Sequence, residues 1–442
     1  MAMHWPGLFV TVSCLLASYR GPAQGTVGAD LYTTNQNLTH AFWNAVERSN
    51  GPVTVLAFGD SVSDSYRSIQ TFVFQRLQAQ LGWAGDTLGN FQNTTLWQLG
   101  NGTAVNGPST NWWGIQGAIP PGGFLFWTNQ GSVVGSLVCD QLGVFWIAQP
   151  NGGAFSLSVS TNGGPWTPVL ALDGYSLVPA GRYASASLER RPYRLRVDGL
   201  SGTNLILGPR YLDSTSSGID VAFMTQDGAN LNQIFSLSTN LLYPILAALN
   251  PQLVVWHMKE LGDIGEIGLS NRLYDLEALW KACVTNGDIV YIGTPYDIDD
   301  LTQEFTPIQN QLVRQAALRD HRVYMDCMTP CVSYQSMTNN GYLDDAVHPS
   351  NLCDSFLASI AWEELGLFAL RVDRHISMES SGTVVHLRWP TAPNLTYDLE
   401  SSSNLQNWSV LGSFVGNGQF QTYSNLLSAG SNVFFRIQLR DK

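Results

Sequence analysis

The sequence predicts an α/β protein: a three-layer, doubly wound parallel sheet with an inserted β-sandwich of jelly-roll type and a small C-terminal β-sandwich. In residues 27–90 and 219–368, short apolar segments alternate with helical patterns, as expected for a sheet covered by helices on both faces. Residues 91–218 instead hold many short strand-like segments between turns rich in Gly and Asn. Residues 371–442 return to a two-residue alternation of apolar and polar positions, which predicts a separate β domain.

The first strand and helix of the α/β domain place a serine at a prominent position. Residues 53–58 form an apolar, β-branched segment typical of a strand buried on both faces, and a helical pattern runs from about Tyr66 to Leu81. Ser61 lies between the two, at the carboxyl end of the strand. Ligands bind at this edge of an open α/β sheet, and backbone N–H groups at a helix start can hold an anion.

The remaining strands and helices follow in alternation after the insert. Strands are predicted at 219–224, 253–257, 289–292 and 322–325, and helices at 231–249, 271–283, 302–318 and 350–365. Five strands alternating with helices predict the doubly wound sheet.

A base for Ser61 is available near the end of this domain. Asp345 and His348 occur together in Asp-Ala-Val-His, just before the last predicted helix. His348 can take the proton of the serine, while Asp345 orients and stabilises the imidazolium. Ser61 as a simple helix cap and Asp345 as a turn cap are the alternative interpretations. The buried strand before Ser61 and the distant Asp/His pair favour catalysis.

Gly59-Asp60-Ser61 after the first strand, with Asp345-x-x-His348 before the last helix, resembles the SGNH (GDSL-type) hydrolase family. The β-module inserted after the first strand and helix is similar to the layout of bacterial peptidoglycan O-acetylesterases, over roughly residues 30–366. The resemblance implies removal of acetyl groups from cell-wall sugars. It also implies an oxyanion hole made by the N–H groups of Ser61 and Gly228 and by an Asn side chain.

Lys259 stands where the resemblance places that asparagine, within His257-Met-Lys-Glu260. Lysine is a flexible, charged donor, and removal of one oxyanion donor typically costs ~3 kcal/mol. Three interpretations stay open: an unusual hole that uses Lys259, a shifted alignment, or a weak enzyme. Asn230 is the nearest alternative donor, and His257 is predicted to be a buried core histidine.

The insert also carries candidate substrate-binding aromatic residues. Trp112 and Trp113 lie among Gly, Pro, Asn and Ser, so we expect them to be exposed and able to stack on sugars. For the other tryptophans of the insert the prediction is mostly a sandwich core, at Trp97, Trp127, Trp146 and Trp166.

The charge and the N-terminus restrict partners and location. The 442 residues carry a net charge of −12 without a basic cluster, which argues against nucleic acid and anionic membrane surfaces as partners. Gly7–Ala17 is an apolar segment too short to span a bilayer, and Gly21-Pro-Ala23 offers small residues for cleavage. Residues 1–23 are therefore predicted to be a signal peptide of a secreted or periplasmic protein, with no later transmembrane segment. The domain at 371–442 resembles the fibronectin-III-like modules of exported bacterial enzymes.

Cysteines and acidic residues give no metal or cofactor site. Cys327, Cys331 and Cys353 bracket the Asp345/His348 loop, where a disulfide would staple it. Zinc is disfavoured because no His lies at ligand spacing. Asp297, Asp299 and Asp300 form a calcium candidate, although a solvated acidic loop is the simpler interpretation. We expect Cys283 in the core, and the pairing among these thiols and Cys139 stays open.

The leading hypothesis is an exported serine esterase that removes O-acetyl groups from peptidoglycan or another acetylated glycan, without a cofactor. A lipase-like or plant-polysaccharide acetylesterase with the same Ser61, His348 and Asp345 is the first alternative. The second is a weak or inactive hydrolase scaffold that binds carbohydrate. Lys259 favours this last alternative, and the intact Ser/His/Asp set opposes it.

Overall fold

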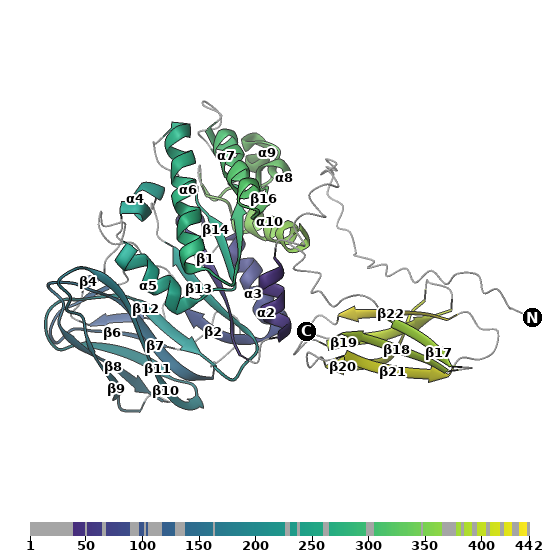
Figure 1. The fold of residues 1–442 in the computed structure, drawn as a ribbon, viewed down its shortest axis with the longest axis horizontal. Helices are drawn as coiled ribbons and strands as arrows, with labels where there is room; N and C mark the ends of the chain where they lie inside the picture. The colour runs from purple at the N-terminus through teal and green to yellow at the C-terminus, as the bar shows by residue number, and fades with distance from the viewer. Residues whose placement is uncertain are drawn as a thin grey trace, which may run out of the picture. The chain divides into compact units, whose positions relative to one another are not determined.

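The computed structural model describes residues 39–48, 51–63, 68–88, 97–100, 103–104, 117–128, 138–161, 164–225, 230–236, 239–259, 265–297, 305–345, 348–364, 377–381, 384–390, 396–403, 407–415, 420–426 and 433–439. The chain divides into two compact units (Figure 1), one spanning Gly28–Phe368 and one containing Ala369–Lys442. In the part of the chain that the structure describes, no helix is long and apolar enough to cross a membrane.

A parallel sheet forms the centre of the larger unit. All five strands predicted for it are present, and a sixth joins them. In spatial order they are β2 (Trp83–Thr87), β13 (Ile219–Thr225), β1 (Val53–Gly59), β14 (Leu253–His257), β15 (Asp288–Ile292) and β16 (Val323–Met325). β1 is buried at every position because β13 and β14 flank it and helices cover both of its faces. The predicted doubly wound sheet is confirmed.

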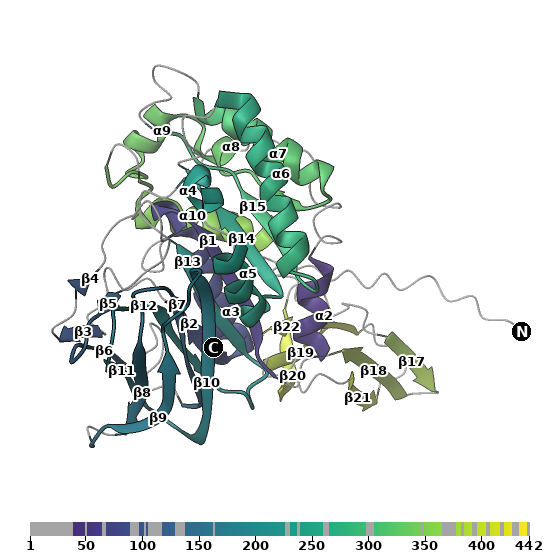
Figure 2. The same ribbon diagram turned by 60° about the vertical axis from the view of Figure 1, so that its left-hand side comes forward.

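Helices cover the two faces of this sheet, giving three layers (Figures 1 and 2). One face packs Leu56, Phe58 and Trp256 against α5, α6 and α7. The other face packs against α3, where Phe74 and Phe223 have ring centroids 5.9 Å apart, and α10 packs on α3. The helices are α2 (His40–Arg48), α3 (Ile69–Leu81), α4 (Leu231–Ser236), α5 (Thr239–Leu249), α6 (Gly265–Cys283), α7 (Phe305–Arg319), α8 (Met328–Cys331), α9 (Tyr334–Asn339) and α10 (Asn351–Glu364).

Several helix predictions were wrong at their boundaries: α6, for example, begins at Gly265, six residues before the predicted start at 271. α3 begins at Ile69 rather than near Tyr66, because Ser68 caps it with its hydroxyl oxygen 3.0 Å from the Thr71 N–H. The helix predicted over 231–249 is two helices, α4 and α5.

The insert is a β-sandwich, but one of its sheets continues the central sheet. β12 pairs antiparallel with β2, and β7 and β10 extend the sheet beyond it. The second sheet has the order β3-β6-β11-β8-β9, and Leu142, Trp146, Phe155 and Leu195 lie in the core between the two sheets. The predicted inserted β-sandwich is present, and it shares one sheet with the central sheet because β12 pairs with the edge of β2. The strands are β3 (Trp97–Gly100), β4 (Thr103–Ala104), β5 (Gly117–Ile119), β6 (Phe124–Thr128), β7 (Cys139–Ala148), β8 (Ala154–Ser160), β9 (Thr167–Asp173), β10 (Ala180–Arg191), β11 (Arg194–Gly199) and β12 (Asn204–Leu212).

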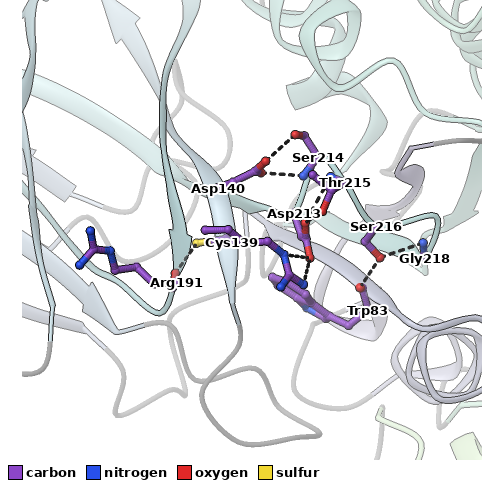
Figure 3. Close-up of polar contacts among 10 residues, drawn as sticks. Trp83, Cys139, Asp140, Arg191, Asp213, Ser214, Thr215, Ser216 and Gly218 are labelled. Carbon is purple, nitrogen blue, oxygen red and sulfur yellow. Dashed lines mark hydrogen bonds and ion pairs between the residues drawn. The ribbon is translucent and has the colours of Figure 1, made fainter.

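The loop that returns from the insert to β13 is fixed by side chains (Figure 3). Asp213 accepts a 2.6 Å bond from Arg190, and Asp140 accepts bonds of 2.7 Å from the N–H and the hydroxyl of Ser214. Ser216 donates to the carbonyl of Trp83 at 2.8 Å. The insert and the parallel sheet are thus joined by side-chain contacts as well as by strand pairing.

The C-terminal unit is a small β-sandwich of two three-stranded sheets. One sheet is β17 (Ser377–Ser381), β18 (Val384–Pro390) and β21 (Phe420–Leu426), and the other is β20 (Ser409–Val415), β19 (Thr396–Ser402) and β22 (Phe434–Leu439). Val385, Leu387, Trp389, Leu399 and Phe435 form its core. The predicted β domain is present, and its fibronectin-III-like identity stays a prediction.

A buried ion pair connects β12 of the insert with β13 of the parallel sheet, the two strands on either side of β2. Asp220 on β13 is fully buried and lies 2.8 Å from Arg210 on β12. Its carboxylate also accepts bonds from the hydroxyls of Thr54 at 3.1 Å and Thr87 at 2.9 Å. A buried carboxylate is tolerated only when its hydrogen-bonding capacity is filled, and here β1, β2 and β12 all contribute.

We predict that Arg210→Met lowers the free energy of unfolding by about 3–5 kcal/mol, because it leaves the Asp220 charge buried without its partner. Arg191→Met removes an exposed pair with Glu189 and serves as the control, with an expected effect of about 0–1 kcal/mol. Urea unfolding followed by circular dichroism measures both. Equal effects would show that the buried pair is not needed.

Candidate active site

The turn after β1 is built by close contact with β14. A side chain on Gly59 would place its Cβ 1.8 Å from the carbonyl oxygen of His257 and 2.3 Å from the hydroxyl of Ser63. Only glycine permits this approach of the two strands. Directly after β1, Ser61–Ser63 forms a short 3-10 helix, so Ser61 stands at the carboxyl edge of the sheet as predicted. It does not stand at the start of α3, which begins later in the chain.

Asp60 holds the backbone of this turn. The residue is fully buried, and one carboxylate oxygen accepts the Val62 N–H at 3.1 Å. The other oxygen accepts the Lys259 N–H at 2.8 Å, so the carboxylate bridges the turn after β1 and the loop after β14. This role of Asp60 is not predicted from the sequence, although its position beside Ser61 is a signal for one.

Ser63 and Gln70 add a second link below the turn. Ser63 donates to the carbonyl of His257 at 2.5 Å, and the Gln70 amide donates to the Ser63 hydroxyl at 2.8 Å. All of these groups are buried. Neither residue is predicted from the sequence, because polar side chains in a turn and in a helix have no distinctive spacing.

Asp345 and His348 are brought together, as the sequence predicts. The carboxylate lies 2.9 Å from His348 Nδ1, and its other oxygen accepts the His348 N–H at 2.7 Å. The Asp344 N–H donates to the His348 carbonyl at 3.0 Å, and a bridge between Leu343 and Pro349 closes the loop. A carboxylate on Nδ1 favours the tautomer that leaves a basic lone pair on Nε2. The pair therefore has the geometry of a histidine base and its orienting acid.

Lys259 is engaged in an ion pair. Its ammonium lies 2.9 Å from Asp297, and the two side chains are only 12% and 5% exposed. Asp297 was one of three acids considered for calcium, and the other two, Asp299 and Asp300, lie outside the described residues. Within the described ranges no group of three or more His, Cys, Asp or Glu side chains is arranged to hold a metal ion.

His257 at the end of β14 is a core residue, as predicted. It is fully buried, and among the described residues neither ring nitrogen has a hydrogen-bond partner. Burial lowers the pKa of His257 to about 3, and the neighbouring backbone of Val62 offsets this only in part. The imidazole is therefore neutral at ordinary pH.

The other candidate residues are described only in part. Asn230 directly precedes α4, where its carbonyl accepts the Ile234 N–H at 3.1 Å. Gly228, Trp112 and Trp113 lie outside the described residues, and Ser61 is described through its backbone. The Ser61–His348–Asp345 triad and the oxyanion donors therefore stay predictions.

The disulfide considered near the His348 loop is absent from the structure. Cys327, Cys331 and Cys353 are buried and form no disulfide, and the same holds for Cys139 and Cys283. A hydrogen bond with Cys331, reinforced by burial, raises the pKa of Cys353 well above its usual value. The Cys353 N–H donates to the Ser350 hydroxyl at 3.3 Å, which links the start of α10 to the residue two positions after His348. Cys283 lies in the core, as expected.

We predict that His257→Leu makes the protein less sensitive to acid. Below pH 6.5 the unfolded chain protonates His257 while the folded chain, with a pKa of about 3, does not, so stability falls as the pH falls. Between pH 7.5 and pH 5.0 this effect amounts to about 2 kcal/mol in the wild type and is missing in the variant.

Urea unfolding of both proteins at the two pH values measures the difference between them. The two proteins must be compared because both contain Asp86, whose effect on stability has the opposite sign. Burial and the charge of Asp220 raise the pKa of Asp86 to about 7, so this residue makes the folded state more stable as the pH falls. An equal loss of stability in the two proteins would contradict the buried, neutral state of His257.

Comparison with solved structures supports the fold. A peptidoglycan O-acetylesterase structure superimposes with a TM-score of 0.55 at 17% sequence identity, covering 76% of this chain and 96% of that one. A GDSL-like lipase from Parabacteroides merdae (TM-score 0.29, 14% identity) covers 34% of this chain and 74% of its own. An acetylxylan esterase mutant from Geobacillus stearothermophilus (TM-score 0.27, 16% identity) also covers 34% and 74%.

No protein-family model matches this sequence, and no curated protein matches it. The likeness to the peptidoglycan O-acetylesterase covers 76% of this chain, so it extends beyond the parallel sheet alone. The chain therefore has the SGNH (GDSL-type) hydrolase fold that its two short motifs predict.

Proposed function

We propose that the chain is an exported serine esterase that removes O-acetyl groups from a polysaccharide. The observation that carries this proposal is the Asp345–His348 pair, with 2.9 Å between the carboxylate and Nδ1, in a chain whose Ser61 begins the Asp60-braced turn after the central strand. Nucleophile, base and orienting acid are the parts that acyl transfer by a serine requires.

In the proposed reaction the Ser61 hydroxyl attacks the acetyl carbonyl while His348 Nε2 takes its proton. Asp345 stabilises the imidazolium, and the N–H groups of Ser61 and Gly228 bind the oxyanion. The tetrahedral intermediate collapses, and the sugar oxygen leaves with the proton from His348. Water, deprotonated by His348, then attacks the acetyl-serine and releases acetate. This sequence requires no cofactor.

A polysaccharide substrate is supported by the likeness to a protein named as a peptidoglycan O-acetylesterase, which covers 76% of this chain and 96% of that one. The inserted sandwich extends the parallel sheet, because its strand β12 pairs with β2. Peptidoglycan and other acetylated glycans both fit this proposal, and both require a secreted or periplasmic protein.

One observation favours a second candidate function. Lys259 occupies the expected place of the oxyanion asparagine, and its ammonium is paired with Asp297. A chain that lost this donor would bind acetylated carbohydrate without cleaving it efficiently. Other esterase substrates, such as plant polysaccharides or lipids, use the same catalytic set and differ in surface loops.

We predict that the mature chain hydrolyses an aryl acetate and that Ser61→Ala abolishes this activity, because no other group then forms the acetyl-enzyme. Ser359→Ala, an exposed serine on α10, is the matched control and should retain full activity. Release of p-nitrophenol measures both. Equal background rates in the wild type and Ser61→Ala would favour the carbohydrate-binding alternative.

We predict that Asp345→Asn lowers kcat by about 10²–10⁴-fold, because the amide neither fixes the Nδ1–H tautomer of His348 nor stabilises its charge. Asp344→Asn, the adjacent exposed acid, should lower kcat less than about tenfold, because the variant keeps the backbone N–H that donates to the His348 carbonyl. Steady-state kinetics on the aryl acetate compare the two. A greater loss of kcat in Asp344→Asn than in Asp345→Asn would show that Asp345 is not the orienting acid.

A further inference from the structure

The Lys259–Asp297 pair lies where three strand ends meet. Lys259 follows β14, and its ammonium reaches Asp297 in the segment after β15, at 2.9 Å. Its backbone N–H reaches Asp60, after β1, at 2.8 Å. One residue therefore contacts the carboxyl ends of all three neighbouring strands.

Further bonds tie the same loop to the β15 side. The Thr294 hydroxyl donates to the carbonyl of Met258 at 3.3 Å, and Thr294 exchanges two bonds with the Asn310 side chain, at 2.8 and 2.7 Å. All three residues are buried. The segment that carries Asp297 is thus fixed to α7, and it can hold Lys259 in one place.

The pairing changes what Lys259 can contribute to an oxyanion. An ammonium 2.9 Å from a buried carboxylate belongs to a neutral pair, so little of its positive charge remains for a third group. To act as a strong donor it would have to leave Asp297, which would then be a buried anion without its cation. Meanwhile its backbone N–H orients the carboxylate that also accepts the Val62 N–H.

We propose that Lys259 is a positioning residue rather than an oxyanion donor. Held by Asp297, it presents its backbone N–H to Asp60, and Asp60 in turn holds the Ser61–Ser63 backbone in the conformation that the reaction needs. The oxyanion is then bound by backbone N–H groups alone. This inference rests on the proposed esterase function, since it concerns the turn that carries its nucleophile.

A double-mutant cycle on kcat tests the proposal, with wild type, Lys259→Met, Asp297→Asn and the double variant assayed on the aryl acetate. Each single variant should lose at least about tenfold in kcat with KM changed less than about twofold, because the turn is misplaced while binding remains. The kcat of the double variant should be no lower than that of the less active single variant, because the two residues act as one unit. Lys259→Arg, which keeps the charge and can pair with Asp297, should restore most of kcat.

An Asp297→Asn protein with wild-type or higher kcat, beside an inactive Lys259→Met, would overturn the proposal and make Lys259 a direct donor. Unchanged kcat in both single variants would also overturn it. Losses that multiply in the double variant would do the same, since they would mean that the two residues act independently.

A control variant separates positioning from general destabilisation. Arg322 lies 2.7 Å from buried Glu277 in a pair of similar burial, before β16 and so at the opposite edge of the sheet. Arg322→Met should lower the melting temperature as Lys259→Met does but leave kcat within about twofold of wild type. If Lys259→Met does not fold, Asp297→Asn and the charge-exchanged Lys259→Asp/Asp297→Lys protein replace it, and recovery of kcat in the exchanged protein supports the pair.

Failure of the underlying function gives a different result. If the wild type shows no hydrolysis that depends on Ser61, the esterase proposal falls and the positioning role falls with it. If the wild type is active and Asp297→Asn is unaffected, the positioning role falls alone.

Discussion

The buried carboxylate of Asp60 is the contact on which the candidate site depends. It lies directly after β1, a strand buried at every position, and accepts one N–H from its own turn and one from the loop after β14. A fully buried anion is stable only when such donors are supplied, so the Asp60 charge favours the arrangement in which the turn after β1 and the loop after β14 both present an N–H group to it. Gly59 permits this by leaving no side chain between the strands. The position of Ser61 is therefore a consequence of backbone packing and one carboxylate, before any catalytic partner is considered.

Sequence patterns predicted the elements that depend on local or strongly apolar signals. The five parallel strands were found because each is a short buried apolar segment, and the Asp345–His348 contact because the two residues lie three apart in one turn. β2 was missed because Trp83-Ala-Gly-Asp-Thr87 has no apolar alternation and becomes a strand through its neighbours β13 and β12. The partner of Lys259 was missed for a similar reason: Asp297 comes close only when β14 and β15 align.

Polar groups inside the molecule occur where sheet segments of different origin meet. The Arg210–Asp220 pair connects the antiparallel strands of the insert to the parallel sheet, and Asp140, Arg190 and Asp213 fix the returning loop beside it. At the carboxyl edge of the parallel sheet, Asp60, Lys259 and Asp297 connect strand ends in the same manner. Ionic contacts thus join units that apolar packing alone would leave free to shift, at a desolvation cost that only complete hydrogen bonding offsets.

The shared sheet has a mechanical consequence. A sugar-binding module on a flexible linker searches a polymer independently of its enzyme, and its gain in affinity depends on linker length. Here β12 is hydrogen-bonded to β2, so the insert and the parallel sheet share one continuous sheet and are held in a fixed relative position. A glycan bound by the insert would reach the Ser61 edge at a fixed distance and angle. The fixed distance between the insert and Ser61 would then determine which acetyl group along the glycan is presented to the serine.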